Sequence, residues 1–312
     1  TIYGQAKSGF IMIVSVVICS YNRAAYIGAA LDSLYHQSAS KENFEVIVVD
    51  NNSTDGTEQV FVQWRAANPE GHFYYTTEIN QGASFARNKG AQLAKADWLC
   101  FMDDDAVATP DYIHHIIRHT NTHPNVLGFG GKIIPKYIPA EPKWMSYYVS
   151  SLVGNFDYSP VACAFENGKY PLESNMIMKK SAFDLVGGFN VAIPGVVGTL
   201  RIGGEGKELF YKIIALGEKI YYDPSLLVYH VVEVEKLTPT YMYRVASGIG
   251  RGERARTKAI SQKAYLLKIV EYLFKLGASI VLGVKYALQL HPAKFWPIIQ
   301  FRIDALKGLL NR

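Results

Sequence analysis

Apolar runs alternate with amphipathic segments through the first half of the chain. The apolar runs are short and rich in β-branched or aromatic residues, which is typical of strands buried on both faces. They span residues 13–19, 44–49, 72–77, 98–102 and 126–134. Segments with apolar residues at helical spacing lie between most of them, at residues 24–37, 57–67 and 83–96. This alternation predicts an α/β fold with a Rossmann-like, mostly parallel sheet flanked by helices.

The second half of the chain is less regular. Its pattern predicts a strand over residues 172–178 and a helix closed by glycine over 207–217. Residues 220–222 and 226–230 fit two short strands on either side of a turn at Asp223-Pro224. Helical spacing then dominates, so we expect a helical C-terminal extension.

Polar side chains follow the predicted strands at the points where the strands end. Ser20, Tyr21 and Arg23 follow the first strand, Asp50 follows the second, and Asp103-Asp104-Asp105 follows the fourth. Ligands of open α/β sheets bind beyond the carboxyl ends of the strands. We therefore expect these side chains to meet at one binding edge of the sheet.

The acidic run Asp103-Asp104-Asp105 has a specific chemistry. Adjacent carboxylates at the end of a buried strand repel one another unless a cation lies between them. Carboxylate oxygens suit Mn²⁺ or Mg²⁺, and such ions bind one or two carboxylates together with substrate phosphates. A solvated acidic turn that caps the next helix is the alternative interpretation.

Several segments match one family in chain order. They are VVICSYNR at 16–23, VIVVDNNSTDGT at 46–57, NQGASFARN at 80–88, MDDD at 102–105, the stretch from Asn175 to Asn190, Gly203-Gly204-Glu205, and Tyr222 through His230. Together they closely resemble the family 2 inverting glycosyltransferases, which have the GT-A fold. The resemblance covers residues 13–250, and the order of the motifs makes it more specific than any one of them.

The resemblance implies a role for each matched position. Donor-binding residues would be Ser20, Tyr21, Arg23, Asp50, Gly82, Arg87, Asp103 and Asp104. Within this set, Asp50 would hydrogen-bond the base, typically uracil, and Gly82 would let the backbone approach the donor. Metal ligands would be Asp105, Asp103 and His230, the two aspartates forming a DxD motif.

The resemblance also implies a carboxylate that takes the proton from the acceptor hydroxyl. The family supplies it from a Glu-Asp pair at a helix start, whereas this chain has Glu205-Gly206. Glu205 keeps the motif position and is the expected base, and Glu208, three residues on, is the second catalytic candidate. The missing aspartate leaves open a non-catalytic protein that only binds a nucleotide sugar. A nucleotidyltransferase would need a glycine-rich phosphate loop after the first strand, which residues 20–23 do not provide.

These motifs predict a transferase that moves a sugar from a nucleoside diphosphate, with UDP expected, to a glycan or lipid-linked saccharide. Inversion, dependence on Mn²⁺ or Mg²⁺, and a place in polysaccharide biosynthesis follow from the same resemblance. The expected divisions are residues 1–12 as a leader or cloning remnant, 13–250 as the GT-A catalytic domain, and 251–312 as a basic helical extension. The catalytic domain would divide into a nucleotide-sugar half, 13–135, and an acceptor half, 136–250.

Charge is distributed unevenly along the chain. Residues 251–312 carry 12 Lys or Arg and 3 Asp or Glu, whereas residues 1–250 carry 20 and 24. The tail lacks the run of about 20 apolar residues that a spanning helix needs. We therefore expect interfacial helices on an anionic membrane surface. The alternative is helices packed on the catalytic domain or on a second subunit of a homodimer. Nucleic acid is not an expected partner, because the body is acidic and no nucleic-acid motif occurs.

Cysteine and glycine content add two smaller expectations. The three cysteines form no CxxC pair, which favours a reducing compartment and no zinc or redox site. We accordingly expect a cytoplasmic protein, peripheral on the inner face of the membrane. The glycine-rich residues 248–252 are expected to form a helix break or a mobile loop.

Overall fold

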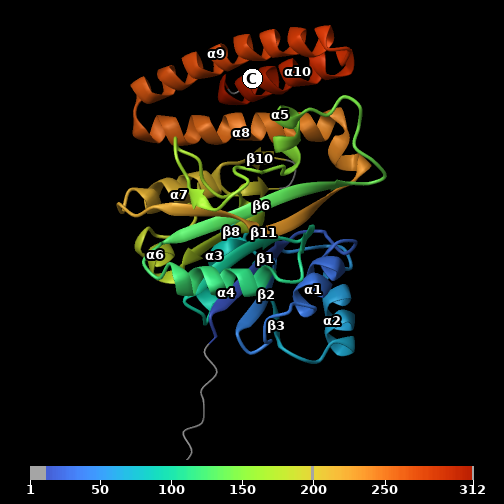
Figure 1. Ribbon diagram of the computed structural model, residues 1–312, viewed down its shortest axis with the longest axis vertical. Helices are drawn as coiled ribbons and strands as arrows, with labels where there is room; N and C mark the ends of the chain where they lie inside the picture. Colours follow the sequence, from blue (N-terminus) through green and yellow to red (C-terminus); the bar gives the residue numbers. More distant parts are fainter. Residues whose placement is uncertain (1–11, 198–199, 311–312) are drawn as a thin grey trace, which may run out of the picture.

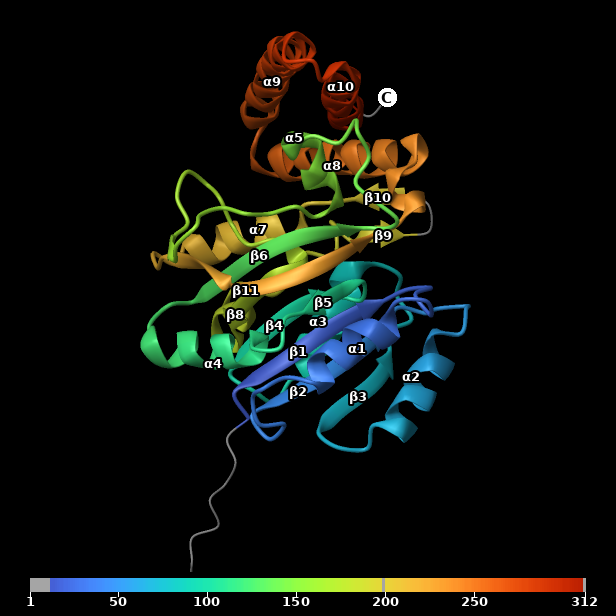
Figure 2. The same cartoon turned by 45° about the vertical axis from the view of Figure 1, so that its right-hand side comes forward.

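The computed structural model describes residues 12–197 and 200–310, so the predicted leader lies outside the described residues except for Met12. The strands of its main sheet are β1 Val14–Ser20, β2 Phe44–Asp50, β3 His72–Thr77, β4 Trp98–Asp103, β5 Ala106–Ala108, β6 Gly128–Tyr137, β7 Cys163–Ala164, β8 Met176–Lys179 and β11 Ile220–Val232. Their order in the sheet is β3-β2-β1-β4-β8-β6-β11-β5, with β7 also paired to β11. Figures 1 and 2 show helices on both faces of this sheet and three long helices stacked beyond it.

Most strands of the sheet run in the same direction. β1 pairs in parallel with β2 and β4, β2 with β3, and β6 with β11. β8 lies antiparallel between β4 and β6, and β5 lies antiparallel beside β11. The register sets Ser20 opposite Asp50 and Cys19 opposite Asp103. The predicted mostly parallel sheet is confirmed, and the strand ends meet at one edge as expected.

Alternate residues of β1 feed two separate apolar layers. Val16 and Ile18 face α1, α2 and α4, whereas Val17 faces α3, α6 and α7. These helices span Ile27–Tyr35 (α1), Thr57–Ala67 (α2), Ala83–Leu93 (α3), Tyr112–Thr122 (α4), Lys180–Leu185 (α6) and Glu205–Ile214 (α7). A strand buried on both faces therefore holds helices on both sides of the sheet, which fixes the binding edge rigidly.

Three predicted strands differ from the structure. The strand expected over residues 172–178 begins only at β8, and the 3-10 turn η2, Glu173–Asn175, precedes it. The buried Asn175 side chain holds this turn, because its Nδ2 donates to the carbonyls of Lys132 and Leu226 at 3.1 and 2.7 Å. Residues 220–230 form one strand, β11, with a bulge between Asp223 and Leu227 instead of a turn. Pro224 lies in that bulge, where its missing N–H costs no ladder hydrogen bond.

The C-terminal layer consists of α8 Pro239–Ile260, α9 Gln262–Leu288 and α10 Phe295–Leu310. It forms a third apolar cluster with the short helix α5, Tyr147–Ser150, and the 3-10 turn η1, Ser151–Val153. In Figure 2, α8 lies between the sheet and the α9–α10 hairpin. Within residues 12–197 and 200–310, no helix is long and apolar enough to cross a bilayer.

The glycine-rich residues 248–252 do not break a helix, contrary to the expectation. They lie inside α8, and residue 250, the predicted domain boundary, falls within the same helix. A Cβ at Gly250 would lie 2.0 Å from the carbonyl oxygen of Ala305, and one at Gly252 only 1.6 Å from that of Gly203. Close backbone packing thus explains the glycines, and it offsets their low helix propensity.

Candidate active site

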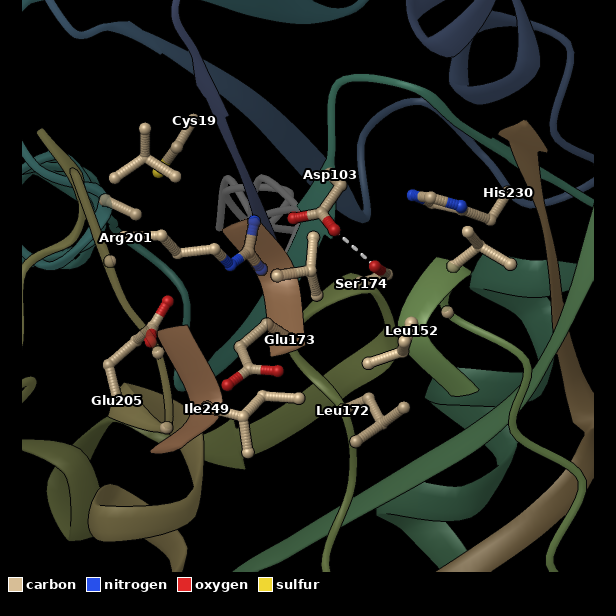
Figure 3. A pocket seen from close by; sticks show the side chains of 18 of the residues that line it. Cys19, Asp103, Leu152, Leu172, Glu173, Ser174, Arg201, Glu205, His230 and Ile249 are labelled. Atoms are coloured by element: carbon tan, nitrogen blue, oxygen red, sulfur yellow. Dashed lines mark hydrogen bonds between the residues drawn. The ribbon is translucent and has the colours of Figure 1, made fainter. Parts of the chain in front are cut away.

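A cavity of about 370 Å³ opens at the carboxyl edge of β1 and β4 (Figure 3). Its lining comes from the ends of β1 and β4, from β11 and α3, and from η1, the segment around η2, the loop before α7, and α8. The predicted site residues that line the cavity are Tyr21, Arg23, Arg87, Asp103, Asp104, Asp105, Glu205 and His230. The sequence motifs that are far apart in the chain therefore meet in one place.

Three candidate metal ligands lie together in this cavity. Asp103, Asp105 and His230 each offer one ligand atom, and these atoms lie within 4.8 Å of one another. Asp103 ends β4, and His230 lies on β11, opposite Ala106 of β5. Two carboxylates and an imidazole form a donor set that suits Mn²⁺ and Mg²⁺. The residues present fit a divalent cation.

Asp105 already faces two basic side chains. Its Oδ1 lies 2.9 Å from His230 Nε2, and its Oδ2 accepts a hydrogen bond from Lys236 Nζ at 2.5 Å. Lys236 belongs to the 3-10 turn η3, Val234–Leu237, and is 3% exposed. Burial alone would raise the pKa of Asp105, but His230 and Lys236 hold it below its usual range. The Asp105 carboxylate therefore stays ionised, and in the buried site its negative charge is stabilised by the basic side chains around it.

Asp104 has the opposite electrostatic character. It is buried, and its nearest cation is Arg23, whose Nε lies 3.5 Å from Asp104 Oδ1. Burial and the charge of Asp105 raise the pKa of Asp104 to about 8. The pKa values of the two adjacent carboxylates thus shift in opposite directions, because His230 and Lys236 lie closer to Asp105 than Arg23 lies to Asp104.

Arg87 connects the two sides of the cavity. Its Nη1 donates to Glu205 Oε1 at 2.9 Å, and its Nη2 lies 3.5 Å from Asp103 Oδ1. The side chains of Arg87 and Glu205 are both buried, so their contact is shielded from water, whereas the Asp103 side chain is 32% exposed. Glu205, the first residue of α7, is thereby held in an ion pair.

Four predicted site residues do not line the cavity: Ser20, Asp50, Gly82 and Glu208. The Asp50 carboxylate accepts a hydrogen bond from the Ser53 N–H at 3.2 Å. Glu208 faces away on α7, where its carboxylate lies 3.0 Å from Lys212 Nζ. The structure therefore leaves Glu205 alone, of the two predicted base candidates, facing the cavity.

The loop at Gly82 has a structural reason for its glycine. Gly82 has φ of +138°, and its N–H donates to Asn51 Oδ1 at 2.6 Å. A Cβ there would lie 2.9 Å from the carbonyl oxygen of Pro194. The glycine thus lets two loops of this chain cross at the edge of the cavity.

Sequence reasoning missed several residues that line the cavity or contact its ligand cluster. They are Glu173, Arg201, Lys207, Lys236, Tyr241, Val245, Ile249 and Glu253. Lys236 lies six residues after His230, which ends the last matched motif. Its position so close to a predicted metal ligand could have marked it as a candidate site residue. The four α8 residues occur at helical spacing, but no pattern in the sequence indicates which face of that helix meets the cavity.

Comparisons with known proteins show which family the chain belongs to. The sequence profile described as "Glycosyl transferase family 2" matches residues 15–186. An uncharacterized glycosyltransferase of Haemophilus influenzae is 26% identical over 298 residues, which cover 89% of this chain and 86% of the relative. The glucosyl-dolichyl phosphate glucuronosyltransferase of Haloferax volcanii is 27% identical over 224 residues, or 70% of this chain and 69% of that protein.

Solved structures share the same architecture. The mannosyltransferase PcManGT of Pyrobaculum calidifontis, determined in complex with GDP-Man and Mn²⁺, superposes with a TM-score of 0.66 at 19% identity. The match covers 97% of this chain and 88% of that one. This likeness confirms the GT-A-like fold. Because the family profile spans more than half of the sequence, the chain belongs to glycosyl transferase family 2.

Proposed function

We propose that this protein transfers a sugar from a nucleoside diphosphate sugar, with UDP as the expected nucleotide, to a glycan or lipid-linked saccharide with inversion. The observation that carries the proposal is the meeting of Asp103, Asp105 and His230 in one cavity at the carboxyl edge of the sheet. The family supports sugar transfer, and the resemblance of the motifs supports inversion.

Asp103, Asp105 and His230 would hold Mn²⁺ or Mg²⁺. A divalent ion bound there supplies positive charge to the diphosphate leaving group of the donor. The neighbouring PcManGT was solved with Mn²⁺ and a nucleotide sugar, which supports the same arrangement here. Ser174 donates a hydrogen bond to Asp103 Oδ2 and so fixes one candidate ligand in the absence of substrate.

The basic residues of the cavity have distinct tasks in this proposal. Arg23 is partly exposed and ends the first motif, so its guanidinium can turn from Asp104 toward a phosphate. Arg87 is held at both ends by Glu205 and Asp103, which keeps the donor side of the cavity rigid. A rigid cavity lowers the cost of ordering the donor before transfer.

A second function is favoured by one specific observation. Gly206 stands where the family pattern has an aspartate, and the adjacent Glu205 is tied to Arg87. A protein that binds a nucleotide sugar without transferring it would have this appearance. Turnover separates the two functions, because only the transferase releases nucleoside diphosphate from the donor.

The outer face of α9 supports a membrane surface as a further partner. Exposed apolar side chains recur at helical spacing along one stripe of this helix. They are Leu266, Leu267, Val270, Leu273, Phe274, Val281, Val284 and Leu288. A long apolar stripe on a helix that cannot span a bilayer is typical of a helix lying in the membrane interface.

Positive charge next to the apolar stripe of α9 favours an anionic bilayer as the surface that the stripe contacts. A second cavity, of about 360 Å³, lies between α9 and α10 and is lined by Lys275, Lys285 and Arg302. Within the described ranges, Lys285 and Arg302 form no ion pair with an acidic side chain. Two cations without acidic partners beside an apolar stripe match the phosphate layer of an anionic membrane. A second copy of the chain on this stripe is the competing outcome.

Donor binding tests the metal site directly. We would titrate the full chain with UDP and with a panel of UDP- and GDP-sugars by calorimetry, with Mn²⁺ or with EDTA. The proposal expects Mn²⁺-dependent binding that Asp105→Ala abolishes and that Asp184→Ala, at an exposed aspartate on α6, leaves intact. Equal affinity with and without Mn²⁺ in the unmodified protein would refute the metal-dependent part of the proposal.

A further inference from the structure

The carboxylate of Glu173 occupies the space beside Gly206. The Gly206 N–H donates to Glu173 Oε1 at 3.1 Å. A Cβ built on Gly206 would lie 2.6 Å from the same oxygen and 2.9 Å from Glu173 Cδ. A side chain at residue 206 and the carboxylate of Glu173 therefore exclude each other. The chain has a carboxylate at this point of the cavity, but it arrives from η2 instead of α7.

Glu173 also differs from the other acidic groups of the cavity. Six carboxylates line it: Asp103, Asp104, Asp105, Glu173, Glu205 and Glu253. Five of them are ion-paired with an Arg, Lys or His. Glu173 forms no ion pair with any residue in the described part of the chain. A partner cation stabilises the charge of a carboxylate and so lowers its affinity for a proton. Asp104 is an exception, because burial and the charge of Asp105 outweigh its 3.5 Å contact with Arg23.

The backbone around Glu173 is firmly anchored on the donor side. The next residue, Ser174, donates to Asp103 Oδ2, and Asn175 accepts a hydrogen bond from Tyr112 Oη at 2.7 Å. Figure 3 shows Glu173, Glu205, Asp103 and Ser174 around the same cavity. Glu173 thus stands at a fixed distance from the candidate metal ligands and beside the apolar wall formed by Leu172 and Ile249.

We propose that Glu173 is the catalytic base of this transferase, a proposal that rests on the sugar transfer proposed above. The acceptor hydroxyl oxygen forms a bond to the anomeric carbon as its proton passes to the Glu173 carboxylate. The bond from that carbon to the diphosphate oxygen breaks, and its electron pair leaves with the nucleoside diphosphate. Glu173 then returns the proton to solvent. Glu205 is a positioning residue, because its carboxylate holds Arg87 and does not need to touch the acceptor.

Electrostatics supports this assignment. Burial and the neighbouring charge of Glu205 raise the pKa of Glu173 above its usual value, although Arg87 opposes the shift. A carboxylate with a raised pKa accepts a proton more readily near neutral pH. The ion pair with Arg87 leaves Glu205 the weaker candidate.

The experiment uses two readouts on the full chain with Mn²⁺. Affinity for UDP reports folding and donor binding, and release of nucleoside diphosphate from a panel of nucleotide sugars, with water as acceptor, reports turnover. Glu173→Gln should bind UDP like the unmodified protein and lose about 10²–10⁴-fold in turnover. Glu205→Gln is the matched variant and should weaken donor affinity as well, because it releases Arg87.

A double variant that moves the carboxylate from residue 173 to residue 206, called the relocation variant, tests the proposal by a gain of turnover and not only by its loss. Glu173→Gly should be as inactive as Glu173→Gln, and Glu173→Gly combined with Gly206→Asp should recover at least about tenfold in turnover, because the carboxylate returns to the same space from α7. Acidic side chains are favourable in the first turn of a helix, so α7 tolerates the aspartate.

The possible outcomes separate the two proposals. If Glu173→Gln turns over donor at the unmodified rate, Glu173 is not the base and the sugar transfer still stands. The same conclusion follows if the relocation variant stays inactive while it binds UDP normally. If the unmodified protein binds donors and releases no nucleoside diphosphate from any of them, sugar transfer and the role of Glu173 both fail.

Discussion

Replacing Lys236 by methionine tests whether its ammonium and a divalent cation share Asp105. Lys236 is 3% exposed, and its Nζ contacts Asp105 Oδ2 at 2.5 Å and the carbonyl oxygen of Val231 at 2.6 Å. Methionine fills a similar volume without the charge. A divalent ion on Asp105 would have to displace this ammonium, so the lysine stabilises the metal-free protein and weakens metal binding.

The size of the effect follows from the burial of the pair. Removing one partner of a buried ion pair costs about 3–5 kcal/mol, because the other charge is left uncompensated. His230 still faces Asp105 at 2.9 Å, so we take the lower end, about 3 kcal/mol. If even half of that opposes metal binding in the unmodified protein, the variant binds Mn²⁺ about tenfold more tightly, since about 1.4 kcal/mol is a factor of ten.

Thermal unfolding with EDTA and with Mn²⁺ measures both consequences. Without metal, Lys236→Met should unfold several degrees below the unmodified protein, at about 2 °C per kcal/mol for a chain of this size. Mn²⁺ should close most of that difference and should saturate at a lower concentration in the variant. Lys132→Met, which removes a lysine paired with Asp157 outside the cavity, should leave the Mn²⁺ response unchanged. Equal or weaker Mn²⁺ affinity in Lys236→Met would refute the reasoning.

Three further predictions concern the C-terminal layer. Ion pairs that outweigh burial lower the pKa of Glu253 to about 2, so they contribute roughly 3 kcal/mol of stability that is complete above pH 4.5 and lost as the pH falls toward 2. In urea unfolding, Glu253→Gln should be less stable at pH 7 and should lose less stability between pH 5 and pH 3. Gly252→Ala should destabilise the chain by more than about 3 kcal/mol, measured by the same method, because its Cβ would lie 1.6 Å from a backbone carbonyl oxygen. The unmodified chain should sediment with vesicles containing phosphatidylserine and not with neutral ones, and Phe274→Glu with Val281→Glu should abolish this, whereas Val62→Glu on α2 should not. Unchanged sedimentation of the double variant would contradict the membrane surface, and a shift from dimer to monomer on the same substitutions would identify a second copy as the occupant.

The sequence predicted the donor half of the fold because its signals there are local. Strands β1, β2 and β4 are largely apolar runs, and the ends of β1 and β4 lead to side chains that line the cavity, such as Arg23 and Asp103. The register between β1 and its neighbours then brings those strand ends together without further information.

The acceptor half could not be predicted in the same way, because its contacts join distant segments. Glu173 reaches Gly206 across 33 positions, and Lys236 reaches Asp105 across 131. Periodicity carries no information about such pairs. The glycines of residues 248–252 were misread for a related reason: their low intrinsic helix propensity is a local property, whereas the backbone of α10 and the loop at Gly203 decide their conformation.

Helix α8 lines the cavity with some of its residues and packs against α10 with others. Tyr241, Val245 and Ile249 line the cavity, while Gly250 touches the backbone of α10. The hairpin of α9 and α10 is consequently not structurally independent of the cavity. An engineer who exchanges it for another anchor must also redesign the helix that borders the reaction space. A change in the position of the hairpin would therefore also move α8 and the part of the cavity that α8 lines.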